Sequence, residues 1–170
     1  MANVAQRGYN QTKLMRKGRR IIIGIVILAI VPVALLFLLS LFARRPSNLG
    51  EKDGHLAPCP STPNCVSTEA VDAEHQIAPL HFEGSADAAM ARLQSIIGRM
   101  PRMRLVVLEG NYLYVEFTSQ IFRFTDDVEF LIDPATNTIH FRSASRVGSS
   151  DLGVNRLRME EIRAQFDKRP

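Results

Sequence analysis

Two cysteines, Cys59 and Cys65, are the only ones in the 170-residue chain, and they lie in the proline-rich stretch APCPSTPNCVST, residues 57–68. Such a pair could bind a metal, act as a redox couple or nucleophile, or form a disulfide. Zinc sites usually place two to four residues between paired cysteines and redox pairs place two, whereas five separate these. His55 and His75 could supply nitrogens, but nothing in the sequence fixes them near the sulfurs. All these readings stay open until the compartment of the segment is known, and an oxidising compartment favours the disulfide.

A second group with chemical potential lies in the last third of the chain. In residues 121–133 the apolar side chains Phe122, Phe124, Val128, Phe130 and Ile132 fall at even positions, and Asp126 shares that inward parity. A carboxylate that points into a core needs donors around it. We therefore expect a polar cluster, structural or functional, drawn from the following residues: Asp126, Asp127, Arg142, Ser143, Ser145, Arg146, Asp151, Asn155 and Arg156.

Two strands and a helix must position this cluster. Pairing Phe130 with Phe141 keeps both rings on one face, and this register places Asp126 near Ser145. The same register sets Val128 near Ser143 and Glu129 opposite Arg142, which predicts a cross-strand ion pair. A final helix over 149–166 has an apolar stripe of Leu152, Met159, Ile162 and Phe166, and Asn155 lies on that stripe.

The remaining elements follow from similar patterns. Residues 75–82 predict a first strand, and residues 85–100 predict an amphipathic helix with Ser85 as its N-cap. Gly110-Asn111 predicts a two-residue hairpin between two apolar strands, with Val106 and Leu108 sharing a face with Leu113, Val115 and Phe117. The order predicts an α+β fold, an antiparallel sheet with two helices on one face. A final helix lying across a curved sheet would make a helix-grip-like arrangement.

Residues 21–42 form an uncharged apolar stretch of 22 residues, long enough to cross a hydrocarbon core. The first 20 residues carry six basic side chains and no acidic one, whereas Arg44 and Arg45 follow the stretch. This bias predicts a signal anchor with a cytoplasmic N-terminus and a periplasmic C-terminal domain in a bacterial inner membrane. The expected organisation is a basic tail (1–20), a transmembrane helix (21–42), a linker (43–56) and an exported domain (57–170).

Three alternatives to a transmembrane anchor are less consistent with the sequence. A cleaved signal peptide would place Ala43 at the −1 position, but Leu41 is a poor −3 residue. A lipoprotein motif ending at Cys59 would lie far beyond the apolar stretch and has a proline before the cysteine. A buried core helix is disfavoured by the length of the stretch and its lack of charge.

The basic charge of the whole chain does not indicate nucleic-acid binding. The isoelectric point is about 9.4, but six of the 21 basic residues lie in the tail. The remaining 15 basic and 17 acidic residues give the rest of the chain a net charge near −2. The tail is explained by membrane topology and by contact with anionic headgroups.

Three sequence motifs in the exported part resemble those of a known family. They are LAPCPSTPNCVST (56–68), FRFTDDVEF (122–130) and RSASRVGSSDLGVNRLR (142–158). Together they resemble a family of bacterial and plastid proteins defined only as a domain of unknown function, over about residues 49–166. The resemblance implies an exported or membrane-anchored domain and contributes no catalytic residues.

The sequence therefore predicts a membrane-anchored periplasmic domain that binds a protein, a lipid or a small, apolar ligand. Two alternatives are an enzyme that uses Asp126 or Asp127 with nearby arginines, and a thiol or metal role of Cys59 and Cys65. No G-x-S-x-G, H-E-x-x-H or phosphate-binding glycine loop occurs, so the sequence favours binding over catalysis and predicts no cofactor or metal.

Overall fold

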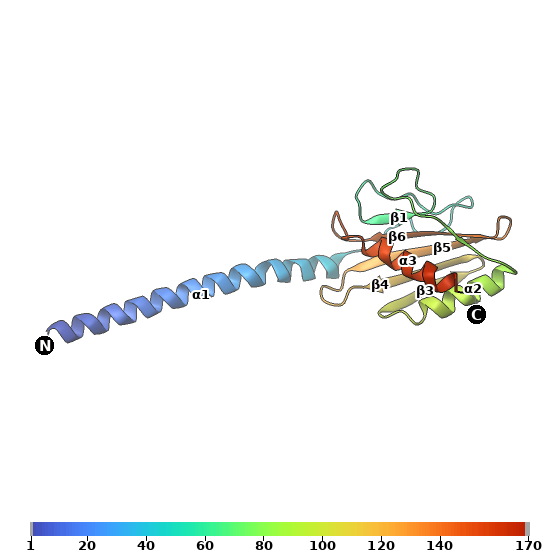
Figure 1. The fold of residues 1–170 in the computed structure, drawn as a ribbon. Coiled ribbons are helices and arrows are strands. Elements are labelled where there is room, and N and C mark those ends of the chain that lie inside the picture. Colours follow the sequence, from blue (N-terminus) through green and yellow to red (C-terminus); the bar gives the residue numbers. More distant parts are fainter. Residues whose placement is uncertain (1, 169–170) are drawn as a thin grey trace. The chain divides into compact units, whose positions relative to one another are not determined.

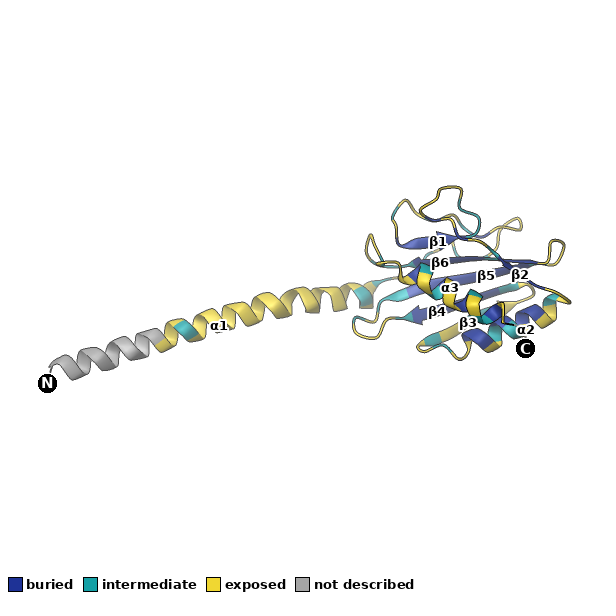
Figure 2. Ribbon diagram, in the orientation of Figure 1, coloured by how far each residue is buried: buried dark blue, intermediate teal, exposed yellow. Residues whose placement is uncertain are grey.

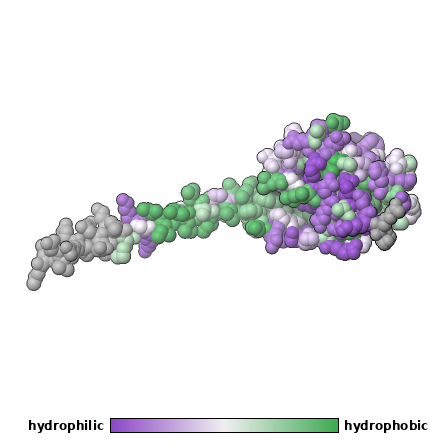
Figure 3. All heavy atoms as spheres, viewed as in Figure 1, coloured by the Kyte–Doolittle hydropathy of each residue, from purple (hydrophilic) through white to green (hydrophobic). Residues whose placement is uncertain are grey.

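The N-terminal helix α1, Ala2–Phe42, contains the apolar stretch (Figure 1). The computed structural model describes residues 2–168, and it describes side chains from residue 15 onward, so the first part of the predicted basic tail has no described side chains. From Met15 to Phe42 the helix is long and apolar enough to cross a membrane. From Ile21 to Phe42 its side chains are exposed and mostly apolar (Figures 2 and 3), a surface that a lipid bilayer could cover.

The chain divides into two compact units, residues 1–41 and 42–170. The second unit contains one antiparallel sheet of six strands among the described residues, with the order β1-β6-β5-β4-β3 and β2 also paired with β6. The strands are β1 (Cys65–Ser67), β2 (Leu80–His81), β3 (Met103–Glu109), β4 (Tyr112–Thr118), β5 (Thr125–Asp133) and β6 (Thr138–Ser145).

Both remaining helices, α2 (Ala86–Ile97) and α3 (Val154–Phe166), pack on the same face of this sheet (Figure 1). Ser85 caps α2 by accepting a hydrogen bond from the backbone N–H of Ala88 at 3.2 Å, as its sequence position predicted. The buried stripes of both helices meet the inward side chains of the sheet, including Leu113, Val128, Phe130 and Phe141, in one core. The predicted α+β fold is confirmed.

The predicted register of the central strands is also confirmed. Phe130 pairs with Phe141, Asp126 with Ser145 and Glu129 with Arg142. The hairpin at Gly110-Asn111 joins β3 to β4, with Glu109 opposite Tyr112. Hydrophobic alternation fixed these pairings because a one-residue slip would turn every core side chain to the other face.

Several element boundaries differ from the predictions. A bulge between Leu105 and Val107 displaces Val106, so Leu105 lies opposite Val115. β5 begins at Thr125 rather than at residue 121, because Arg123 has a φ of 59° and the 119–124 loop closes on itself. The Ser119 N–H donates to the Phe124 carbonyl, and the Phe124 N–H donates to Ser119 Oγ. The predicted first strand is reduced to β2.

Helix α3 begins at Val154, not at residue 149. Leu152 and Gly153 have φ angles of 56° and 80°, which end any helix there. Gly153 is the N-cap residue, and Asp151 accepts hydrogen bonds from the N–H groups of Gly153 (3.0 Å) and Asn155 (2.7 Å), which pairs one N–H of the first helical turn. Leu152 was predicted to be buried, but it is 91% exposed.

Residues 44–58 contact the sheet, although residues 43–56 were predicted to be a linker. Leu56 is buried, and Arg45 and Gly50 form hydrogen bonds with β4 and β5. The core side chains of these strands point toward α2 and α3, so alternation turns the partners of Arg45 and Gly50 to the opposite face. We call residues 44–58 the covering segment.

Candidate functional site

A helix-side cluster lies between α3 and the sheet and consists of Asp126, Ser143, Ser145, Asn155 and Arg158. The Ser145 hydroxyl donates to Asp126 Oδ1 at 2.5 Å, and it accepts a hydrogen bond from the Asn155 amide at 3.0 Å. Asn155 also donates to the backbone carbonyl of Asn64 at 3.1 Å. Its Oδ1 accepts from the Ser143 hydroxyl and from Arg158. The buried amide thus uses both donors and its acceptor.

Arg158 supplies the charge that balances Asp126. Its Nη2 forms an ion pair with Asp126 Oδ2, and its guanidinium lies 4.7 Å from the centroid of the Phe117 ring. Nη1 donates to Ser143 Oγ and Asn155 Oδ1. The carboxylate is therefore neutralised by a cation that has three other contacts, which is how a buried charge is accommodated.

A second group, the arginine–carboxylate cluster, lies on the opposite face of the sheet under the covering segment. It comprises Arg45, Arg104, Tyr112, Tyr114, Glu116, Asp127, Glu129, Arg142 and Arg146. Tyr112, Tyr114 and Glu116 alternate with the core residues of β4, so they share this face.

Arg146 is at the centre of this cluster. It donates from Nε to Asp127 Oδ2 at 2.9 Å and from Nη2 to Asp127 Oδ1 and Glu116 Oε1, both at 2.6 Å. Nη2 also lies 3.0 Å from the Tyr114 hydroxyl, which is 2.5 Å from Asp127 Oδ1. Asp127 is 1% exposed, so its charge depends on these donors.

Glu129 forms the other half of the cluster and is fully buried. It accepts hydrogen bonds from Tyr112 (2.8 Å) and from the backbone N–H of Gly50 (2.7 Å), and it forms a 3.2 Å ion pair with Arg142. This pair is the one that the strand register predicted. Arg142 Nε is buried and has no partner among the described residues.

The ion pairs and hydrogen bonds of the arginine–carboxylate cluster set the protonation states of its acidic groups. Burial raises the pKa of Glu116, but hydrogen bonds from Arg45, Arg146 and Arg104 outweigh it and lower the pKa to about 2. Burial and the neighbouring Asp127 raise the pKa of Tyr114, and burial and Glu129 raise that of Tyr112. Glu116 is therefore a fixed anion at neutral pH, and the two phenols stay protonated.

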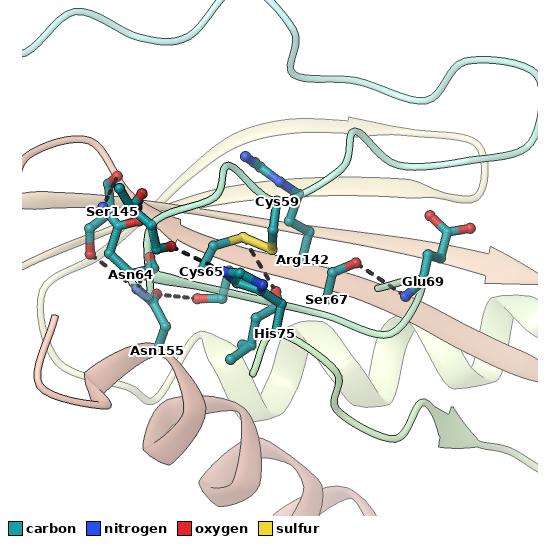
Figure 4. Close-up of a disulfide and its surroundings, with 12 residues drawn as sticks. Cys59, Asn64, Cys65, Ser67, Glu69, His75, Arg142, Ser145 and Asn155 are labelled. Carbon is teal, nitrogen blue, oxygen red and sulfur yellow. Dashed lines mark hydrogen bonds between the residues drawn. A yellow bond between two sulfur atoms is a disulfide. The ribbon is translucent and has the colours of Figure 1, made fainter. Parts of the chain in front are cut away.

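Cys59 and Cys65 are joined in a disulfide with a Cα–Cα distance of 5.7 Å (Figure 4). His75 lies beside it, with Nδ1 2.6 Å from Asp72 and Nε2 3.2 Å from the Thr62 carbonyl. Burial lowers the pKa of His75, but its bonds to Thr62 and Asp72 give a net increase. Both sulfurs are used in the bond, so neither is a free thiolate in this state.

A hollow of about 400 Å³ opens beside the helix-side cluster. Asp126, Arg158 and Phe117 contribute to its wall, together with Val154 and Leu157 of α3. Residues 100–102 and 118–120 close its other side. The hollow thus combines two apolar side chains of α3 with the Asp126–Arg158 ion pair and with two further charged residues, Arg102 and Glu161.

The predicted cluster is divided between the two faces of the sheet. Asp126, Ser143, Ser145 and Asn155 converge as the register predicted. Asp127, Arg142 and Arg146 lie on the opposite face, while Asp151 accepts a hydrogen bond from the first turn of α3. Arg156 donates instead to the carbonyls of Glu74 and Gln76.

Sequence reasoning missed several members of both clusters. Arg158 is three residues after Asn155, so helical spacing could have placed it on the same face. Tyr114 and Glu116 have the outward parity of a solvent-facing strand. Arg45 follows the apolar stretch, where a basic residue is explained by topology.

These features define an α+β domain that follows an N-terminal helix able to span a membrane, with a disulfide at the start of its first strand. The chain belongs to the family described as Protein of unknown function (DUF1499), which matches residues 55–166. No curated protein matches the chain. The family match begins inside the covering segment, at His55, and includes both strands that carry the predicted cluster.

Proposed function

We propose that this protein is a single-pass protein of a bacterial inner membrane whose periplasmic domain binds a partner at the hollow beside Asp126 and Arg158. The partner is a protein, a lipid or a small molecule. The observation that carries the proposal is the composition of the hollow, in which exposed apolar side chains of α3 adjoin a charged pair. Binding sites commonly combine an apolar lining with a few fixed polar groups.

The geometry gives less support to catalysis by the two aspartates. Asp126 and Asp127 are on opposite faces of the sheet, so they cannot act on one substrate together. Each carboxylate already accepts a hydrogen bond from a hydroxyl and forms an ion pair with an arginine. Such groups hold the site in one shape and suit recognition.

The proposed location has two supports. The tail has six basic residues before the apolar stretch, and basic residues are enriched on the cytoplasmic side. The disulfide then lies on the opposite, oxidising side, where such bonds persist. A reporter that is active only in the periplasm, fused after Pro170, should be active. Activity of a cytoplasmic reporter alone would reverse the orientation.

Binding at the hollow is tested by purifying the full chain with its native membrane surroundings and identifying bound lipids and proteins by mass spectrometry. Leu157 is 69% exposed at the hollow, so Leu157→Glu should deplete the bound partner without unfolding the domain. Val71→Glu is the matched control because Val71 is 98% exposed and is not part of the hollow. Equal recovery of every bound species with both variants would refute binding at this site.

A further inference from the structure

Two strongly exposed apolar side chains of the domain, Ile121 and Leu152, lie in loops at one end of the sheet. β4 ends at Thr118, β5 begins at Thr125, and β6 ends at Ser145, so the 119–124 loop and the 146–153 loop lie at the same end. We call this the tether end. Ile121 is 76% exposed in the middle of the first loop, and Leu152 is 91% exposed near the end of the second, just before α3.

The two loops are close in space. Ser119 and Gln120 line the hollow of about 400 Å³ on one side, and Val154 and Leu157 line it on the other. The 119–124 loop thus lines the hollow, and the 146–153 loop leads into α3, whose first turns line it. The two loops begin side by side, because the Arg146 N–H donates to the Thr125 carbonyl at 3.1 Å, so Ile121 and Leu152 lie at the same end of the domain as Val154 and Leu157. Single exposed apolar residues are ordinary, but a group of them marks an interaction surface.

Chain connectivity identifies what this surface faces. The apolar helix ends at Phe42, and three residues later Arg45 is fixed to Glu116 by a 2.8 Å ion pair. Three residues of chain span at most about 10 Å. Glu116 is two residues before the end of β4, so the point of attachment is at the tether end. A spanning helix would thus hold this end of the domain at the bilayer surface.

The charge of the tether end suits a lipid surface. Arg44 and Arg123 are exposed, and neither has an ion-pair partner in the part of the chain that the structure describes. Arg102 is exposed on the neighbouring 98–102 loop and donates to the carbonyl of Thr118. Basic side chains beside apolar ones favour binding to anionic headgroups.

We propose that the tether end docks on the bilayer, with Ile121 and Leu152 inserted among the lipid headgroups and Arg44 and Arg123 against their phosphates. This proposal rests on the membrane anchoring proposed above and names the lipid surface as the partner at the mouth of the hollow. The depth of such insertion is about 5–10 Å, which exposed loop side chains can reach.

The absence of tryptophan from the chain makes the test direct. Single-tryptophan variants Ile121→Trp and Leu152→Trp of the full chain are incorporated at one copy per nanodisc of phosphatidylethanolamine and phosphatidylglycerol. Brominated acyl chains then quench any tryptophan near the hydrocarbon boundary. Both positions are exposed, so the substitutions leave the core intact. We expect blue-shifted emission that loses about half its intensity with brominated lipid.

Ala135→Trp is the matched control, because it lies in the exposed turn between β5 and β6 at the other end of the sheet. The nine-residue length of β5 places Ala135 about 27 Å from the tether end. This tryptophan should stay red-shifted and unquenched. Equal quenching of all three positions would overturn end-on docking, and so would three unquenched positions.

Two further measurements distinguish lipid from other partners at the tether end. Blue-shifted emission at residues 121 and 152 without bromine quenching would mean that protein covers them, which refutes the lipid proposal. Arg123→Glu in the Leu152→Trp background should reduce quenching in discs containing phosphatidylglycerol more than in discs of phosphatidylcholine alone. If the full chain does not enter nanodiscs at all, the membrane anchoring itself fails, a result distinct from an unquenched but incorporated protein.

Discussion

The two polar clusters lie back to back on the same strands, yet they hold their charges in different ways. The helix-side cluster has one carboxylate, Asp126, which accepts from one neutral donor, Ser145, and pairs with one arginine, Arg158. The arginine–carboxylate cluster has three carboxylates, of which Glu116 and Asp127 share Arg146 while Glu129 pairs with Arg142. Neutral donors can satisfy an uncharged replacement, whereas a network of shared ions leaves a buried charge when one member is removed.

The largest expected effect is loss of Arg146. Arg146→Met leaves Asp127 buried without its main cation, so the free energy of unfolding should fall by about 4 kcal/mol. Denaturant unfolding of the full chain in detergent measures this. Arg104→Met is the control, because Arg104 pairs with the same Glu116 but its side chain is 64% exposed, and it should cost less than about 1 kcal/mol. Similar losses in the two variants would contradict the difference between a shared and an exposed arginine.

Acid should act on the arginine–carboxylate cluster through Glu116. Its pKa is about 2 when folded and 4.5 when unpaired, so its stabilisation is present above pH 4.5 and is lost as the pH falls toward 2. The loss should be on the order of 3 kcal/mol. Unfolding curves across this pH range test it, with Glu116→Gln as the comparison. The variant should be less stable at pH 6 but lose less stability on acidification. A wild-type curve parallel to that of the variant would count against this assignment.

Removal of the disulfide should affect the two clusters to different degrees, because they lie on opposite faces of the sheet. The bond fixes Cys59, the residue after the covering segment, to the first residue of β1. Replacing both cysteines by serine should cost about 2 kcal/mol. Hydrogen exchange should also accelerate at the Gly50 amide, which bonds to Glu129, more than at the Ser145 amide, which bonds to Asn64. Faster exchange at Ser145 alone would show that the bond supports the helix-side cluster instead.

The smallest expected effect is neutralisation of Asp126. In Asp126→Asn the amide oxygen can still accept from Ser145, and Arg158 keeps Phe117, Ser143 and Asn155. The cost should be about 1 kcal/mol by thermal or denaturant unfolding. A loss as large as that of Arg146→Met would mean that the two clusters are equivalent. An unchanged melting temperature with loss of the bound partner would assign Asp126 to recognition.

The sequence predicted features that depend on alternation and missed those that depend on burial of the second face. Phe130 and Phe141 set the register, and from it followed the Glu129–Arg142 pair and the approach of Asp126 to Ser145. The parity of Tyr114 and Glu116 indicated solvent, because nothing in residues 44–58 has the pattern of a strand or helix. The prediction that Leu152 is buried was wrong for a local reason. Leu152 itself has a left-handed backbone conformation, so the helix begins only after Gly153.

The covering segment also constrains the order in which the domain can form. Arg45 and Gly50 are synthesised early, but their partners Glu116 and Glu129 follow 71 and 79 residues later. Contacts of such separation form late, because the intervening chain must first be ordered. The segment that emerges first is therefore among the last to dock, and until then the buried carboxylates of β4 and β5 face water. A nascent chain halted before β5 has Glu116 for Arg45 but lacks Glu129, the partner of the Gly50 N–H.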